Sequence, residues 1–205
     1  MAGKAETTKR ILDSTMKLAA EHGWRATGLG DIADAANVSL VELNKHYGSK
    51  IEILAAFIER TDAKVLAENA KAGASTTAAE SSAEDEEEAA RDRLFDVLMC
   101  RFDALTPHKA AIQRIARDLA RDPLALFCLL PHQARSLAWM LEGAGISSSG
   151  ISGRLRARGL GLVYLSAMRA WFKDDSEDLS ATMGALDRAL GRADTAVRSA
   201  PFRCL

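Results

Sequence analysis

The chain lacks the features that mark secreted, membrane-spanning and disulfide-stabilised proteins. It has only three cysteines among 205 residues, too few and too scattered for a disulfide framework or a zinc knuckle, which predicts free thiols. No apolar run approaches the roughly 20 residues of a membrane-spanning helix. The N-terminus is polar and then amphipathic, so it does not resemble a secretory signal. These absences predict a cytoplasmic protein with no stable membrane span.

An excess of charge of either sign is also missing. The formal net charge is -1, so no overall field attracts a polyanion. Even in residues 1–50, seven Lys and Arg side chains are opposed by six Asp and Glu side chains. A nucleic-acid-binding protein of this composition would depend on a local patch of cations.

Strand signals and enzyme motifs are nearly absent. The chain has no sustained apolar–polar alternation and no Asn-Gly or Asp-Gly hairpin turn. The four histidines, His22, His46, His108 and His132, do not have the spacing of a metal site, and there is no Walker loop or GxSxG motif. The sequence therefore predicts no catalytic residues, no bound metal and no cofactor.

Apolar residues at helical spacing occur throughout the chain and predict an all-α fold of about nine helices. A first helix should end at His22-Gly23, and prolines at 107, 123 and 131 should begin or interrupt later helices. Residues 72–83 are small and polar and predict a linker. The acidic run at 84–88 fits the first turn of the helix that follows it.

Residues 31–50 are the most informative segment, because they predict two short helices joined by a tight turn and followed by a third. Ile32 and Leu43 would anchor the two short helices inward, and Val38 lies in the turn. Ser39 with Glu42 three residues later has the pattern of a helix-capping box. This arrangement is typical of a helix-turn-helix, which places a helix in the DNA major groove.

At these positions the sequence resembles the TetR family of bacterial repressors over about residues 8–56. The resemblance rests on Arg10-Ile11-Leu12, His22-Gly23, Ile32-Ala33, Val38-Ser39, Leu43, His46-Tyr47, Ser49-Lys50 and Leu54. It implies an all-helical homodimer with a DNA-reading head, residues 1–50, and a ligand-binding and dimerisation body, residues 51–198. It also implies a double-stranded operator as partner and release from that operator by a small apolar ligand.

The resemblance assigns residues 40–46 to the recognition helix and gives Lys50 a phosphate contact. The implied DNA-binding set is Gly28, Leu40, Val41, Asn44, Lys45, His46 and Lys50. Four positions depart from the family pattern. The family usually has Gly at Asn37, Gly or another small residue at Val41, Thr at Glu42 and Tyr at Asn44.

A second resemblance supports an alternative function. Leu130-Pro131-His132, Arg158, Tyr164 and the Asp174-Asp175-Ser176 run look like a ubiquinone-biosynthesis family that uses the TetR fold to bind lipids. That resemblance implies a lipid- or isoprenoid-binding accessory protein that no longer binds DNA. The C-terminal residues 198–205 are too short and proline-broken to form that family's amphipathic membrane helix.

Either resemblance implies a ligand site inside the body. The candidate lining residues, which could equally be ordinary core, are Met99, Phe102, Phe127, Leu130, His132, Trp139 and Met140. An apolar stripe on a late helix, Leu160, Tyr164, Met168 and Trp171, is assigned to the dimer interface, with intrachain core as the alternative.

Overall fold

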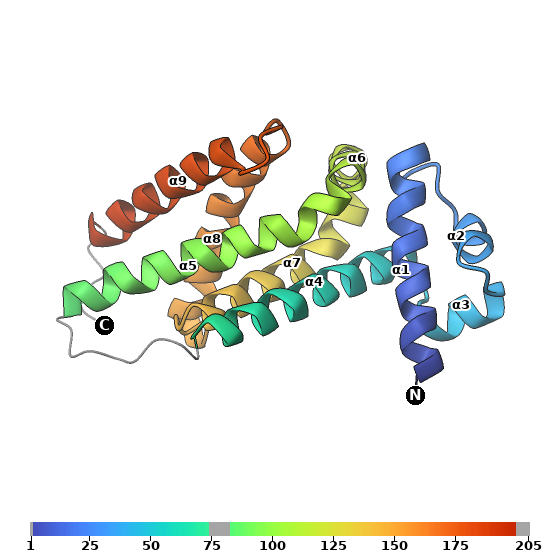
Figure 1. Cartoon of the computed structure of the whole chain (residues 1–205), viewed down its shortest axis with the longest axis horizontal. Coiled ribbons are helices and arrows are strands. Elements are labelled where there is room, and N and C mark those ends of the chain that lie inside the picture. The colour runs from blue at the N-terminus through green and yellow to red at the C-terminus, as the bar shows by residue number, and fades with distance from the viewer. Residues whose placement is uncertain (1, 74–82, 200–205) are drawn as a thin grey trace. The chain divides into compact units, whose positions relative to one another are not determined.

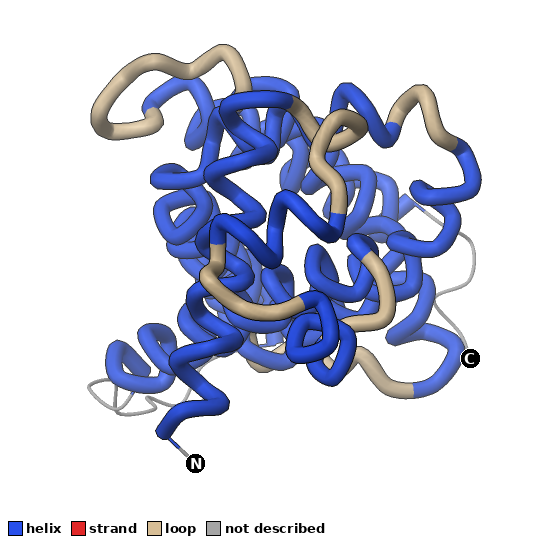
Figure 2. Tube along the Cα trace, turned by 90° about the vertical axis from the view of Figure 1, so that its right-hand side faces the viewer, coloured by secondary structure: helices blue, strands red, loops and turns tan. Residues whose placement is uncertain are grey.

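The computed structural model describes residues 2–73 and 83–199, and every regular element in these ranges is a helix (Figure 2). In chain order, as labelled in Figure 1, they are α1 (Ala2–His22), α2 (Leu29–Ala35), α3 (Leu40–His46), α4 (Lys50–Gly73), α5 (Ala83–Leu105), the 3-10 helix η1 (Thr106–His108), α6 (Lys109–Leu119), α7 (Pro123–Gly143), α8 (Gly150–Trp171) and α9 (Ser180–Ser199). The predicted all-α fold is confirmed.

Several predicted boundaries agree with the structure. Helix α1 ends at His22, where Gly23 takes a positive φ of 90°. Helix α7 begins at Pro123 as predicted, but it runs through Pro131 to Gly143, so the interruption predicted at Pro131 is wrong. The acidic run follows the start of α5. Most of the predicted linker, residues 74–82, lies outside the described residues.

The chain forms two compact units. Unit 1 comprises residues 1–61 and 105–133, and unit 2 comprises residues 62–104 and 134–205. The boundaries between them fall inside α4 and α7. The predicted division into residues 1–50 and 51–198 stays a prediction. The structure groups residues 105–133 with the N-terminal helices, and no local sequence pattern indicates that grouping.

Unit 1 is built around α1. The inward face of this helix carries Ile11, Leu12, Met16 and Ala19, which are all at most 2% exposed. Helix α1 packs against α2 and α6. The contact with α6 is fastened at its end by polar bonds. Arg114 Nη1 donates to the Glu21 carbonyl at 3.1 Å, and the Arg25 backbone N–H donates to Asp118 Oδ2 at 3.1 Å.

Unit 2 contains a buried ion pair, Arg101 with Asp62, whose side chains are 2% and 9% exposed. Arg101 Nη1 donates to Asp62 Oδ1, and Arg101 Nε donates to the Tyr164 hydroxyl at 3.3 Å. The Ser136 hydroxyl donates to Asp62 Oδ1 at 2.8 Å. Burial alone would lower the pKa of Arg101, but Tyr164 and Asp62 raise it above its ordinary value. The cluster therefore links α4, α5, α7 and α8 through a charge held inside the core.

An aromatic cluster lies beside this pair. The ring of Phe102 stacks on Tyr164 at a centroid distance of 5.4 Å and contacts Trp171 at 5.7 Å. Phe102, Trp171 and Met140 are fully buried. Helices α8 and α9 pack closely against each other and close this core.

The turn between α8 and α9 is organised by Asp174. Its Oδ2 accepts from both the backbone N–H and the hydroxyl of Thr182 at 2.7 Å, and its Oδ1 accepts from the Ser176 N–H at 3.2 Å. Desolvation raises the pKa of Asp174, but the hydrogen bonds from Ser176 and Thr182 hold it well below its usual range. The Asp-Asp-Ser run is thus a turn and a helix cap.

We expect the Asp62→Leu variant to lose about 3–5 kcal/mol of unfolding free energy, because it leaves Arg101 charged and unpaired in the core. The double variant Asp62→Leu/Arg101→Met removes both charges and should recover most of that loss. Urea unfolding at pH 7 of the two variants and the parent chain measures both values.

If Asp62→Leu does not fold, Asp62→Asn serves in its place, since the amide oxygen can still accept from Ser136. A loss below about 1 kcal/mol for either single variant would contradict a buried, paired charge.

Candidate nucleic-acid interface

The turn between α2 and α3 has the hydrogen bonds of a Schellman motif. The Val38 N–H donates to the Ala33 carbonyl at 3.0 Å, and the Asn37 N–H donates to the Asp34 carbonyl at 3.0 Å. Asn37 takes a positive φ of 52°, the left-handed conformation that glycine favours and asparagine tolerates. Asn37 therefore departs from the family pattern without changing the shape of the turn.

Helix α3 is capped at its start and anchored by a single side chain. The Ser39 Oγ accepts from the Glu42 N–H at 3.1 Å, which confirms the serine half of the predicted capping box. Leu43 is 1% exposed and fixes the inward face. The opposite face is open: Leu40 is 57% and Val41 69% exposed. A helix held in this way presents one face to a partner.

The predicted DNA-binding residues divide into two groups. Leu40, Val41, Asn44 and Lys45 are exposed together on α3, and His46 is half-buried at its end. Gly28 lies elsewhere, at the N-cap of α2, where its N–H donates to Asp31 Oδ2 at 2.7 Å. Its N–H is therefore engaged within the head.

Lys50 makes contacts within the head that the sequence did not predict, and its predicted phosphate contact stays a prediction. Its ammonium group donates to the carbonyls of Trp24 at 2.8 Å and Thr27 at 2.7 Å. The same nitrogen lies 4.9 Å from the centroid of a Trp24 ring. Burial lowers its pKa from the ordinary value, and the nearby Asp118, Asp122 and Asp31 partly oppose that shift. Two of the three N–H donors of Lys50 bond backbone carbonyls within the head. Lys50 therefore stabilises the segment before α2, and its ammonium group is not fully open to a phosphate.

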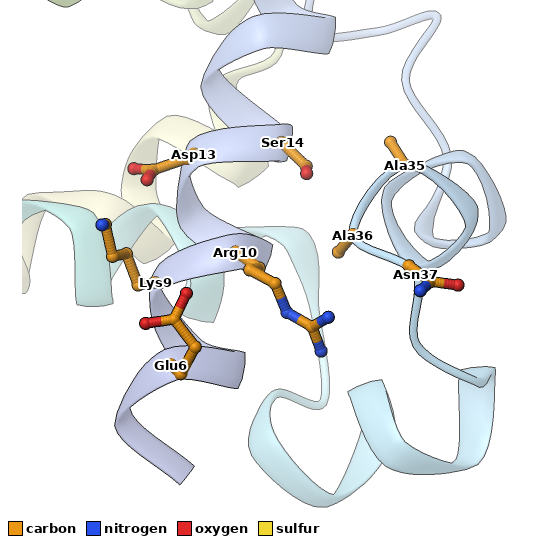
Figure 3. A pocket seen from close by; sticks show the side chains of 8 residues that line it. All are labelled: Glu6, Lys9, Arg10, Asp13, Ser14, Ala35, Ala36 and Asn37. Carbon is orange, nitrogen blue, oxygen red and sulfur yellow. The ribbon is translucent and has the colours of Figure 1, made fainter. Parts of the chain in front are cut away.

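A polar pocket of about 360 Å³ lies between α1 and the α2–α3 turn (Figure 3). Figure 3 shows Arg10 pointing from α1 toward this turn, and the Nε of Arg10 is buried without a hydrogen-bond partner in the described structure. Asp13, on the same helix as Arg10, is paired with Arg60 at 2.7 Å. A cation at the end of α2 is favourable because the helix C-terminus carries partial negative charge. Sequence periodicity did not indicate this pocket, because its lining residues are mostly polar.

The comparisons with known proteins agree with the geometry of the head. The family described as "Bacterial regulatory proteins, tetR family" matches residues 11–57. Over 60 residues, 29% of the chain, the sequence is 34% identical to the HTH-type transcriptional repressor KstR of Mycobacterium tuberculosis. That alignment covers 27% of the length of the repressor, so the chain matches only about a quarter of this curated relative.

Similarity to solved structures extends over nearly the whole chain. A TetR transcriptional regulator from Nitrosomonas europaea aligns with 26% identity and a TM-score of 0.64 over 92% of this chain and 98% of that one. A second TetR-family regulator, from Rhodococcus sp., shares the fold at 17% identity and a TM-score of 0.60, over 93% and 98% of the two chains. The chain therefore shares the fold of TetR-family regulators, and its head matches the family model.

The relatives reported above are described as regulators, and none is described as a lipid carrier. The Asp-Asp-Ser run that suggested the carrier family is a structural cap in this chain. The alternative of a ubiquinone-biosynthesis accessory protein is therefore not favoured.

The structure does not gather the predicted ligand-lining residues into one pocket. Phe102 and Met140 are fully buried in unit 2, where Met99 is half-buried and Trp139 is 49% exposed. Phe127 and Leu130 belong to unit 1 and are 72% and 53% exposed, beside the half-buried His132. The prediction relied on apolar spacing, which does not distinguish the inward face of α7 from the outward one.

The predicted dimer stripe is also placed differently. Leu160, Tyr164 and Trp171 are at most 4% exposed inside unit 2, with Met168 half-buried on the same helix. The exposed apolar residues of α8 lie on its opposite face: Ile151, Leu155, Leu162 and Leu165. The assigned stripe is intrachain core, because it faces the aromatic cluster of the same chain.

Within residues 2–73 and 83–199, no helix is both long and apolar enough to cross a membrane. In the same ranges there is no cluster of metal-ligating side chains, and Cys100 and Cys128 are free thiols. Cys204 lies outside the described residues.

We expect Lys50→Met to lower the unfolding free energy by about 1–2 kcal/mol, because the variant keeps the apolar stem but loses two charged hydrogen bonds to backbone carbonyls. The matched control is Lys45→Met, whose side chain is exposed on α3 and should change stability by less than about 0.5 kcal/mol. Thermal and urea unfolding of both variants test this. Equal stability of the Lys50→Met and Lys45→Met variants would contradict a structural role for Lys50 and leave its side chain available to contact DNA.

Proposed function

We propose that this protein is a transcriptional repressor that binds a double-stranded operator as a homodimer and leaves it when the body takes up a small apolar ligand. Each head would place α3 in one major groove, and the two heads would read half-sites about one helical turn apart. This role implies action in the cytoplasm. No catalytic step is part of the proposal.

The observation that carries the DNA-binding part is the construction of α3. The helix is held by the Ser39 cap and the buried Leu43, so it has a fixed orientation in the head. Its outward face offers a polar amide, Asn44, and an ammonium, Lys45, on a surface that nothing in the described structure covers. The family match over residues 11–57 supports the same use of this helix.

Charge on the reading face is sparse. Lys45 and His46 are the basic residues at the end of α3, while Glu42 lies in its first turn. Lys50 is committed to the fold by its two carbonyl contacts. Non-specific attraction to phosphates should therefore be weak, and binding should depend less steeply on salt than it does for a protein with many phosphate contacts.

The outward face of α8 supports the homodimer. Its four apolar residues follow helical spacing, and exposure ranges from 53% at Leu165 to 89% at Ile151. Met183 of α9 is 41% exposed. A two-fold dimer joins identical patches, and this apolar stripe, interrupted by the exposed Arg158, can pack against its own copy in this sense.

The ligand part of the proposal rests on the core of unit 2. Phe102, Tyr164 and Met140 provide an apolar and aromatic surface, and the Arg101–Asp62 pair beside them provides directional polar groups. Ligand sites typically combine a mostly apolar lining with a few such groups. Uptake of a ligand among α5, α7 and α8 would favour a body shape that separates the heads.

The DNA-binding proposal predicts that the full chain selects a two-fold symmetric sequence from a random duplex library. A shift assay on the selected duplex then measures affinity against salt concentration. Lys45→Met should weaken binding to all sequences about equally and reduce the slope of log K against log salt by about 1 per head. Failure to select any sequence at low salt would overturn the proposed function.

The dimer proposal predicts that Leu162→Glu is monomeric, because it places two like charges in the centre of the α8 interface. Leu124→Glu is the matched control, since Leu124 of α7 and Leu162 are both 73% exposed. Light scattering after size-exclusion chromatography gives the two masses. A dimeric Leu162→Glu variant, or a monomeric control, would contradict the assignment to α8.

A further inference from the structure

The exposed face of α3 combines a short list of chemical groups. Successive residues of an α-helix are about 100° apart around its axis. Asn44 and Val41 therefore lie near the centre of the exposed face, with Leu40 on one side and Lys45 on the other. Leu43 lies on the far side, where it is buried. A partner bound to the centre of this face would therefore contact the amide of Asn44 between the aliphatic side chains of Leu40 and Val41.

The two aliphatic side chains have no packing role in the head. Leu40 is 57% and Val41 69% exposed, whereas the folding anchor of the helix is Leu43 at 1%. Two neighbouring aliphatic residues at the start of a seven-residue helix leave a concentrated apolar surface in water. That surface is stabilised when a partner buries it.

The edges of base pairs in the major groove differ in the groups that could meet this face. Thymine alone carries a methyl group there, and apolar side chains contact it. Adenine presents an N7 acceptor beside an N6 donor, which an asparagine amide matches with two hydrogen bonds. Guanine presents two acceptors and is most often read by arginine or lysine.

Residues 26–50 contain no arginine at all. The cation of α3, Lys45, lies at the edge of the exposed face, where a phosphate contact fits better than a base contact. Glu42, which could accept from cytosine, lies about 160° around the helix axis from Asn44. The centre of the face thus matches adenine and thymine and offers nothing specific to a G·C pair.

We propose that α3 reads consecutive A·T pairs in each half-site, with Val41 and Leu40 against thymine methyl groups and Asn44 bonded to the adenine edge. This inference rests on the proposed DNA-binding function and adds the base chemistry to it. It also agrees with the sparse charge of the head, because discrimination then comes from methyl burial and amide hydrogen bonds rather than from phosphate contacts.

The test uses the full-length chain and the duplex that it selects from a random library. In each half-site, thymines opposite α3 are replaced by deoxyuridine, which removes the methyl group and leaves the pairing unchanged. We expect an affinity loss of about threefold to fivefold for each methyl that is buried. Replacing the contacted adenine with 7-deazaadenine removes the N7 acceptor and should cost roughly tenfold.

Protein variants assign the effect to residues. Val41→Ala should bind the thymine and deoxyuridine duplexes with nearly equal affinity, because it no longer reaches the methyl group. Asn44→Ala should likewise lose the response to 7-deazaadenine. Lys45→Met is the control: it should weaken binding to every duplex in the same proportion and keep both responses. All three positions are exposed, so circular dichroism should show unchanged unfolding temperatures.

Two results would overturn the inference while leaving the proposed function intact. One is a selected half-site whose pairs under α3 are G·C. The other is a deoxyuridine effect that persists unchanged in both Val41→Ala and Leu40→Ala. Selection of no sequence would instead overturn DNA reading as a whole, and the base preference with it.

Discussion

The contact between the Lys50 ammonium and the carbonyls of Trp24 and Thr27 joins the start of α4 to the segment that leads into α2. That segment has no helix of its own, so its carbonyls need partners from outside. Trp24 is 4% exposed and lies beneath the ammonium, which shields the contact from water. Because α2 begins directly after this segment, the placement of the α2–α3 pair depends on a charge that lies outside the reading face.

The core of unit 2 also depends on a charged contact between helices, the buried ion pair of Arg101 and Asp62. Arg101 and Asp62 bring one charge from α5 and one from α4 into the core, and Ser136 and Tyr164 bind them from α7 and α8. A buried pair of this kind contributes little net stability, but it strongly disfavours arrangements in which either partner is left alone. It therefore specifies which helices meet. The aromatic stack of Phe102 and Tyr164 then fills the space beside it.

Helix α8 illustrates how one element can serve two partners. Its inward face, with Leu160 and Tyr164, is part of the core of the chain, while Ile151 and Leu162 lie on the outward face. A helix that is apolar on opposite sides needs cover on both. Among the described residues only one side of α8 is covered, and this asymmetry is the physical basis for proposing that a second copy packs on the other.

The head and the body differ in how much of their structure could be predicted from sequence. In the head, the predicted features are local: the Ser39 cap, the Gly23 stop and the inward Leu43 each depend on residues within one turn. The left-handed turn at Asn37 also follows from its own side chain. In the body, the apolar spacing of α7 and α8 predicts helices. It does not predict which face of each helix is buried, because the period is the same in either case.

The sequence by itself determined the helical class, the end of α1, the start of α7 and the cap of α3, because these follow from periodicity, capping and local backbone preferences. Tertiary structure alone decided three other matters. It turned Lys50 inward to two carbonyls, placed Leu160 and Tyr164 in the core instead of at an interface, and left Phe127 exposed. Each depends on which distant segment lies opposite a given side chain. The spacing of residues along the chain does not show which segments will meet. Packing, and the cost of leaving a buried polar group unpaired, decide that.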